Sequence, residues 1–174
     1  MAFHVLFVCT GNTCRSPMAE GLCRSFLIHF RLQDEVDVAS AGLYATPGGS
    51  ASQEAVAAMA KKGIDLSGHR TVGLSTDIVQ WAHLILTMEE RQRQRLLEKF
   101  PEAAGKVFIL KEYVTTLEAA SGAPAIKKPG LYDILDPFGQ PAPIYHQCAM
   151  ELASAVTDLC IDIYRRLQRD SSPG

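Results

Sequence analysis

The chain has 174 residues, of which 47% are apolar and 21% are charged, and its formal net charge is -2. This length and balance predict one globular domain, and they exclude the basic surface of a nucleic-acid-binding protein and an apolar stretch long enough to cross a membrane. The first residues lack the basic start and small-residue cleavage site of a signal peptide, so we expect a cytoplasmic protein, with a monomer as the default state.

Hydrophobic periodicity predicts strands that alternate with helices. In chain order, we expect a strand at residues 3–8, a helix at 17–30, a strand at 36–39, a Gly/Pro-rich loop at 41–50, a helix at 52–63, a strand at 83–88, an exposed helix at 89–100, a strand at 106–110, a mobile loop at 120–130 and a helix at 147–168. This alternation predicts an α/β fold with a doubly wound, four-stranded parallel sheet flanked by helices. We expect the domain to span residues 1–168 and residues 169–174 to form a flexible C-terminal tail.

Cysteine and histidine usage argues against disulfides and metal sites. The five cysteines are odd in number and unevenly spread, which favours reduced thiols. The five histidines form no i,i+4 pair and have no CxxC partner, so we predict neither a metal site nor a cofactor.

The segment after the first predicted strand combines a thiol with an anion-binding turn. The spacing C-x5-R from Cys9 to Arg15, in CTGNTCR, is a weak signal by itself. However, Cys9 ends a buried strand, Gly11 and Asn12 permit unusual backbone angles, and a helix opens directly afterwards. Backbone N–H groups of such a turn converge on a phosphate, Arg15 adds charged hydrogen bonds, and the positive field favours the thiolate form of Cys9.

Other interpretations of this turn are weaker or blander. The Walker motif GxxxxGK[ST] is absent from the chain, and the turn has no GxGxxG dinucleotide fingerprint. The remaining alternative is that Cys9 is an inert buried strand residue, which is the commoner case for a lone cysteine. The context of the turn favours a nucleophile that faces a bound phosphate.

A thiol phosphatase also needs a general acid, because the leaving group must be protonated. The best candidate is Asp136 in LYDILDPFGQP, where the following Pro137 biases it towards an extended conformation in a loop. Asp133 is the competing carboxylate. An Asp-Pro pair is also common in ordinary turns.

Four segments together resemble the low-molecular-weight protein tyrosine phosphatase family. They are VLFVCTGNTCRSP at residues 5–17, SAG at 40–42, KKGIDLSGHR at 61–70 and LDPFG at 135–139, in the family's order and over most of the chain. The resemblance implies a metal-free phosphatase domain on a four-stranded parallel sheet, with phosphorylated proteins as its partners.

The resemblance also implies residue roles in a mechanism through a phosphocysteine. Cys9 is the implied nucleophile, Arg15 the group that binds the phosphate and the transition state, and Asp136 the acid and then the base. The residues of the implied phosphate-binding loop between Cys9 and Arg15 are Thr10, Gly11, Asn12, Thr13 and Cys14. The implied hydrogen-bond network that supports this loop and the thiolate consists of Asn12, Ser16, Ser40 and His69.

Thr13 bears on the choice of substrate. Tyrosine phosphatases of the family usually have a bulky aliphatic residue there, and the threonine resembles the bacterial protein arginine phosphatase branch, as do LTMEERQRQ and KVFILKEYV. A hydroxyl and a smaller wall suit a planar guanidinium, and Tyr44 and Phe138 are candidates for the pocket walls. We therefore favour phosphoarginine, with phosphotyrosine as the alternative.

Further alternatives remain open. An arsenate reductase on the same fold needs cysteines in the middle of the chain, and none lies between Cys23 and Cys148. A non-catalytic phosphoprotein-binding module is less consistent with the retained nucleophile and acid. In addition, Cys14 is either a small buried loop residue or a redox partner that traps oxidised Cys9 as a disulfide. Residues 117–132 form a longer segment than in the arginine phosphatases.

Overall fold

The computed structural model describes residues 2–119, 128 and 130–170. The strands are Phe3–Cys9 (β1), Val36–Gly42 (β2), Leu84–Thr87 (β3) and Val107–Ile109 (β4). The helices are Arg15–His29 (α1), Gln53–Ala60 (α2), Thr76–Trp81 (α3), Glu90–Lys99 (α4), the 3-10 helix Pro101–Ala103 (η1), Leu110–Ala119 (α5) and Ala142–Asp170 (α6). No helix in the described ranges is long and apolar enough to span a bilayer.

The four strands form one parallel sheet in the order β2-β1-β3-β4, which confirms the predicted fold. The chain first adds β2 on one side of β1 and then β3 on the other side, so the strand order reverses at β1. Doubly wound sheets bind their ligands at the carboxyl ends of the strands, at the point of this reversal. Cys9, the last residue of β1, lies at this point and pairs with Gly42 at the end of β2.

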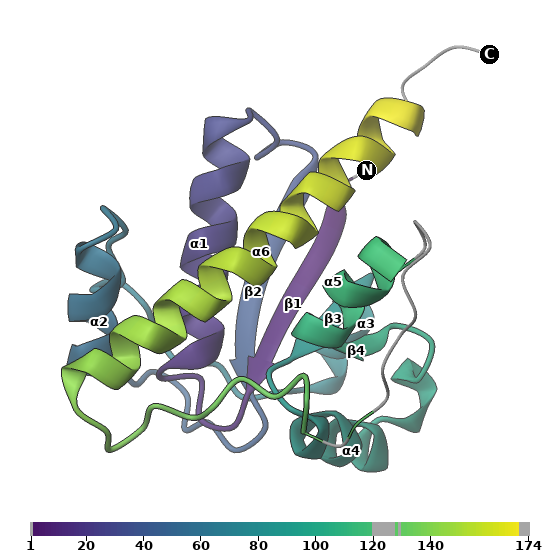
Figure 1. The fold of residues 1–174 in the computed structure, drawn as a ribbon. Coiled ribbons are helices and arrows are strands. Elements are labelled where there is room, and N and C mark those ends of the chain that lie inside the picture. Colours follow the sequence, from purple (N-terminus) through teal and green to yellow (C-terminus); the bar gives the residue numbers. More distant parts are fainter. Residues whose placement is uncertain (1, 120–127, 129, 171–174) are drawn as a thin grey trace.

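The central strand is buried on both faces, as its continuous apolar run predicts. Val5 and Phe7 pack with the helices α1, α2, α5 and α6, whereas Leu6 and Val8 pack with α3 and α4. Figure 1 shows α6 running across one face of the sheet with α1 beside it. Because side chains alternate along a strand, this burial fixes the register of β1 and hence the side to which Cys9 points.

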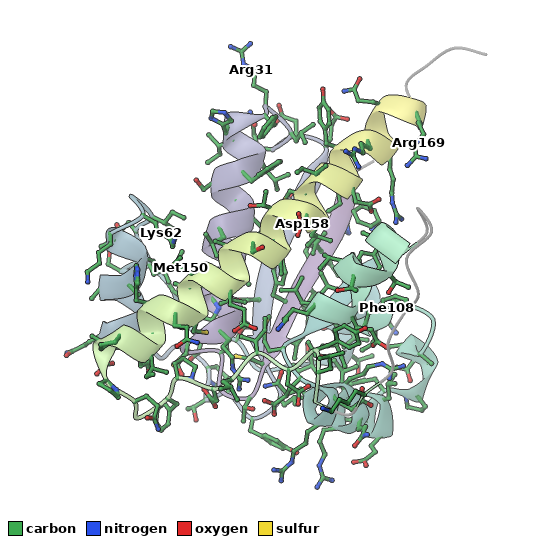
Figure 2. All side chains as sticks on the ribbon, viewed as in Figure 1. Arg31, Lys62, Phe108, Met150, Asp158 and Arg169 are labelled. Atoms are coloured by element: carbon green, nitrogen blue, oxygen red, sulfur yellow. The ribbon has the colours of Figure 1, made fainter. Side chains whose placement is uncertain are left out.

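The carboxyl ends of the strands gather the segments that later form the site. The turn from β1 to α1 lies there, and the segment from residue 130 to the start of α6 passes below the strand ends (Figure 1). Figure 2 shows Arg31, after α1, and Arg169, near the end of α6, at the opposite end of the molecule. The two segments that carry the predicted nucleophile and acid are therefore neighbours in space.

Several element boundaries differ from the predictions. The helices α3 and α5 were not predicted, because α3 has only six residues and α5 begins at Leu110, directly after β4. The helix α6 starts at Ala142 rather than at residue 147, since Pro143 lies in the first turn, where a missing N–H is tolerated.

The predicted exposure of α4 and the predicted tail also need correction. The helix α4 buries Gln92 and Leu96, which are one turn apart on the same face. The helix α6 continues through Asp170, so the first two residues of the predicted tail are helical, and residues 171–174 lie outside the described residues. The mobile loop predicted at 120–130 also lies outside them, except for residues 128 and 130.

Candidate active site

A cavity of about 200 Å³ opens at the carboxyl end of β1. The residues that line it are Cys9, Thr10, Gly11, Thr13, Cys14, Arg15, Asp136 and Phe138. Two distant segments thus meet here, namely the phosphate loop (residues 9–15) and the acid loop (residues 133–138). Tyr44 does not line this cavity, and its side chain is 70% exposed.

The phosphate loop is fixed through its backbone. Asn12 has a positive φ of 57°, whereas Gly11 does not, so the left-handed conformation falls on the asparagine. The carbonyls of Cys9 and Thr10 accept backbone N–H groups from the segment after β2, at 2.9 Å each. A Cβ on Gly42 would lie 2.9 Å from the backbone of Gly11, so the SAG segment ends in a residue without a side chain.

Cys9 is buried and has a hydroxyl partner. Its Sγ lies 2.9 Å from Oγ of Ser16, and Nδ2 of Asn12 donates to the same Oγ at 2.9 Å. The hydroxyl hydrogen of Ser16 then has two acceptors, the sulfur at 2.9 Å and the carbonyl of Ala41 at 3.5 Å, and the sulfur is the nearer one. A hydrogen bond of this polarity stabilises a thiolate.

The side chain of Asn12 links the loop to β2 and to the segment before α3. Its Nδ2 also donates to Oγ of Ser40 at 2.9 Å, and its Oδ1 accepts the backbone N–H of Val72 at 2.8 Å. Nε2 of His69 donates to the Asn12 carbonyl at 2.9 Å. The structure thus brings together all four residues of the predicted network. Oγ of Ser40 donates in turn to Glu20, a residue that the sequence analysis did not find.

Arg15 is 2% exposed and carries its charge among three acceptors. Its Nη1 donates to Oε2 of Glu89 and to the carbonyl of Ile134, at 2.8 Å each, and its Nη2 lies 3.1 Å from Oδ2 of Asp136. Burial opposes the charge, but the hydrogen bond to Glu89 and the carboxylate of Asp136 outweigh burial and raise the pKa of Arg15. The guanidinium is thus a permanent positive charge at the wall of the cavity.

The two candidate acids occupy different places. Asp136 lines the cavity, its side chain is 47% exposed, and its Oδ1 accepts the N–H of Phe138 at 3.2 Å. Asp133 does not line the cavity, and its Oδ1 accepts the backbone N–H of Glu90 at 2.9 Å. Of the two, Asp136 has the access that proton transfer to a substrate requires.

Cys14 lines the cavity, and its thiol also contacts the start of α2 and the first turns of α6. Its Sγ lies 3.4 Å from Oγ of Ser52 and 3.4 Å from the hydroxyl of Tyr145. Burial, together with the hydrogen bond to Cys14, raises the pKa of Tyr145 from 10.0 to about 12. The contact connects the loop to the first turns of α6.

Two residues of the β3–α4 region were not singled out by the sequence analysis. Glu89 binds Arg15, and the buried amide of Gln92 donates to Oγ1 of Thr10 at 3.1 Å while accepting the backbone N–H of Met88 at 2.9 Å. The spacing of Gln92 from Leu96 could have placed it on the buried face of α4. No local pattern identifies Glu89 as the partner of Arg15, because the contact joins residues far apart in the chain.

Comparison with known proteins decides the family. The chain matches the low molecular weight phosphotyrosine protein phosphatase family over residues 4–172. The chain belongs to this family. The predicted resemblance and the prediction of a protein phosphatase are thereby confirmed. Phosphorylated proteins are the substrates that membership of this phosphatase family implies.

Relatives within the family carry two kinds of name. A protein-arginine-phosphatase of Bacillus subtilis is 38% identical over 166 residues, which are 95% of this chain and 97% of that protein. The structure of the YwlE arginine phosphatase from Geobacillus stearothermophilus superposes with a TM-score of 0.82 at 34% identity and covers 99% of each chain. The low molecular weight protein-tyrosine-phosphatase Wzb of Escherichia coli is 41% identical over 106 residues, which are 61% of this chain and 68% of that protein.

The positive charge at the cavity comes from protein groups. Within residues 2–119, 128 and 130–170, no group of three or more His, Cys, Asp or Glu side chains is arranged to hold a metal ion. The cavity presents a buried guanidinium and the start of α1, whose orientation favours anions. This low molecular weight phosphatase site therefore combines an anion-binding wall, a thiol and a carboxyl group.

Proposed function

We propose that this chain dephosphorylates proteins through a phosphocysteine on Cys9, with phosphoarginine as the preferred substrate. The observation that carries the proposal is that Cys9, Arg15 and Asp136 line one cavity although they come from three separate elements. A nucleophile, a phosphate-binding cation and an acid are the groups that phosphoryl transfer to a thiol needs.

In the first step, the Cys9 thiolate attacks phosphorus, so that an S–P bond forms and the bond from phosphorus to the leaving atom breaks. Arg15 and the N–H groups of the phosphate loop hold the equatorial oxygens. Asp136 gives its proton to the leaving atom. The 3.1 Å contact of Asp136 with Arg15 supports this role, because it brings the carboxyl group to the wall of the phosphate site.

In the second step, Asp136 acts as a carboxylate base. It takes a proton from a water molecule, whose oxygen attacks phosphorus while the S–P bond breaks. Phosphate leaves and the thiolate returns, with Ser16 donating its hydrogen bond to the sulfur. The proposed task of Asn12, Ser40 and His69 is to keep the loop and this serine in place, and the hydrogen bonds among them support that task.

The preference for phosphoarginine rests on the chemistry of the cavity. Relatives named protein-arginine-phosphatase align over more than nine-tenths of the chain at 36% and 38% identity. Structures named low molecular weight protein tyrosine phosphatase cover 92% and 98% of it at similar identity, so coverage alone does not separate the two substrates and the choice rests on the cavity. Thr13 lines the cavity with a short polar side chain, which leaves room for a planar guanidinium and offers its hydroxyl oxygen as an acceptor. Phe138 is the proposed apolar wall, and Tyr44, outside the cavity, is proposed to contact the rest of the substrate.

A paired assay tests this preference. The parent protein is expected to release phosphate from a phosphoarginine peptide with a higher kcat/KM than from a matched phosphotyrosine peptide. Thr13→Ile is expected to shift the ratio towards phosphotyrosine, while Thr157→Ile, an exposed change on α6, leaves the ratio as it is. Equal efficiencies in the parent, or a ratio unchanged by Thr13→Ile, would favour the tyrosine phosphatase alternative.

Cys14 is proposed to protect the nucleophile. Peroxide oxidises the Cys9 thiolate to a sulfenic acid, and the Cys14 thiol then displaces water from it to form a disulfide, which an added thiol reduces. Cys14→Ser is therefore expected to recover less activity than the parent after peroxide and thiol. Equal recovery would leave Cys14 as a structural residue of the loop.

The cellular setting is part of the proposal. We take the predicted domain, which α6 extends to Asp170, as one phosphatase domain that works as a cytoplasmic monomer, without nucleic acid or membrane as a partner. All five cysteines are free thiols, which suits a reducing compartment, and the net charge of -2 does not favour binding to polyanions. Sedimentation and cell fractionation test this setting, and a stable dimer or an exported protein would contradict it.

A further inference from the structure

The connection between β3 and α4 supports both sides of the cavity. We call Met88, Glu89 and Glu90 the β3–α4 corner. Glu89 accepts the hydrogen bond from Nη1 of Arg15 at 2.8 Å. The carbonyl of Met88 accepts the N–H of Ile134 at 2.8 Å, and the N–H of Glu90 donates to Oδ1 of Asp133 at 2.9 Å.

The acid loop is therefore attached at two consecutive residues just before Asp136. Ile134 is fully buried, and its carbonyl accepts a hydrogen bond from Nη1 of Arg15 at 2.8 Å. Beyond Ile134, Leu135 and Phe138 are 77% and 70% exposed. The attachment at residues 133 and 134 thus precedes a stretch in which Leu135, Asp136 and Phe138 are exposed and Pro137 is buried.

Asp133 has the contacts of a support rather than those of a proton donor. Its Oδ1 is engaged by the first N–H of α4, which lacks a partner within its own helix and lies at the positive end of that helix. Asp133 is also absent from the cavity lining, which Asp136 joins three residues later. A carboxylate held in this way fixes backbone instead of delivering a proton to a substrate.

We propose that Asp133 is a positioning residue for the general acid, which attaches the acid loop to the β3–α4 corner so that Asp136 reaches the leaving atom. This inference rests on the proposed function, in which Asp136 protonates that atom. Glu89, on the same corner, positions Arg15 instead. One corner therefore controls both walls of the cavity through two separate contacts.

The two contacts predict different kinetic signatures. A misplaced acid slows substrates in proportion to the basicity of their leaving group, because only a basic leaving group needs the proton in the transition state. A misplaced Arg15 weakens stabilisation of the phosphoryl group itself, which all substrates share. The leaving-group dependence of kcat/KM therefore separates positioning of Asp136 from positioning of Arg15 and from a general loss of folded protein.

The test compares para-nitrophenyl phosphate, which has a good leaving group, with phenyl phosphate. For Asp133→Ala, we expect kcat/KM to fall about threefold with para-nitrophenyl phosphate and about thirtyfold with phenyl phosphate. Asp136→Asn is expected to show the same pattern with larger losses. Glu89→Gln is expected to lower both rates by the same factor. Asp77→Ala is the matched control, because Asp77 is an exposed aspartate in the first turn of another helix, and it is expected to lower neither rate.

Asp133→Asn decides between positioning and acid catalysis. Its amide oxygen still accepts the N–H of Glu90, so it is expected to recover most of the activity that Asp133→Ala loses on phenyl phosphate. If Asp133→Asn lowers kcat/KM for phenyl phosphate as much as Asp133→Ala does, and Asp136→Asn lowers it only slightly, Asp133 is the acid and the proposal is wrong. An equal loss on both substrates also overturns the proposal. Turnover by Cys9→Ser would instead overturn the proposed function, independently of Asp133.

Discussion

The phosphate loop and the acid loop face each other across one cavity but are held in different ways. The phosphate loop lies between β1 and α1, and its asparagine and arginine are buried and bonded on several sides. The acid loop keeps its carboxylate 47% exposed and is tied down by a few bonds at Asp133 and Ile134. Substitutions in the phosphate loop should therefore cost both stability and activity, whereas substitutions at the exposed positions of the acid loop, Leu135 and Asp136, should cost little stability.

Cys9→Ser gives the largest expected effect. A serine hydroxyl is not ionised at neutral pH, so turnover is expected to fall by about 10⁴-fold or more for phosphoarginine, phosphotyrosine and aryl phosphates alike. Inorganic phosphate should still raise the melting temperature of the variant, because Arg15 and the loop N–H groups remain. Residual turnover within about tenfold of the parent would mean that another group is the nucleophile.

Substitution of Asn12 tests how firmly the phosphate loop is built. Asn12→Ala removes bonds to Ser16, Ser40 and Val72 and leaves buried polar groups unpaired, so we expect a loss of about 3 kcal/mol of unfolding free energy. Asn12→Gly loses the same bonds but adopts the positive φ more easily, by about 1 kcal/mol. Urea unfolding measures both. If Asn12→Ala and Asn12→Gly have the same free energy of unfolding, the positive φ at this position does not strain an alanine backbone.

The alkaline limit of stability tests the burial beneath the phosphate loop. Burial raises the pKa of Cys148 from 9.0 to about 12, so the folded state favours its protonated form. The contribution of the protonated thiol to the free energy of unfolding is fully present below pH 9 and is lost as the pH rises towards 12. Between pH 8 and pH 11, the free energy of unfolding of Cys148→Ala is expected to fall by about 2 kcal/mol less than that of the parent. Parallel pH profiles would contradict a buried thiol at this position.

Leu135→Ala gives the smallest expected effect and completes the comparison. Leu135 is 77% exposed in the acid loop, so its truncation should change the free energy of unfolding by less than about 0.5 kcal/mol. Urea unfolding alongside Asn12→Ala provides the contrast. A loss as large as that of Asn12→Ala would mean that the acid loop is packed as firmly as the phosphate loop.

How much of the fold the sequence could predict depends on whether an element has local signals of its own. The strands and the turn after β1 follow from local signals, namely apolar runs, turn residues and a helix start, and their place in a doubly wound sheet follows from their order. The short helix α3 has an N-cap serine, Ser75, but its six residues are too few to show a helical period, and α5 is hidden because it continues directly from β4. Elements without a boundary residue or a full helical period cannot be found in this way.

The site divides along similar lines. Cys9 and Arg15 share one short segment, so their cooperation can be inferred from spacing and context. The contacts of Glu89, Gln92 and Asp133 cross from one segment to another and become visible only once the sheet and α4 are in place. Sequence patterns therefore predict the reacting groups, such as Cys9 and Arg15, more readily than the residues that position them.

The central claim is that Cys9 and Asp136 act together through a phosphocysteine, and trapping that intermediate tests it most directly. In Asp136→Asn, para-nitrophenyl phosphate should still transfer its phosphoryl group, but the water that resolves the intermediate lacks its base. Rapid quenching followed by peptide mass spectrometry should then find one phosphoryl group on Cys9, with little in the parent and none in Cys9→Ala. A phosphoryl group on another residue, or none in Asp136→Asn while nitrophenol is released, would contradict the account.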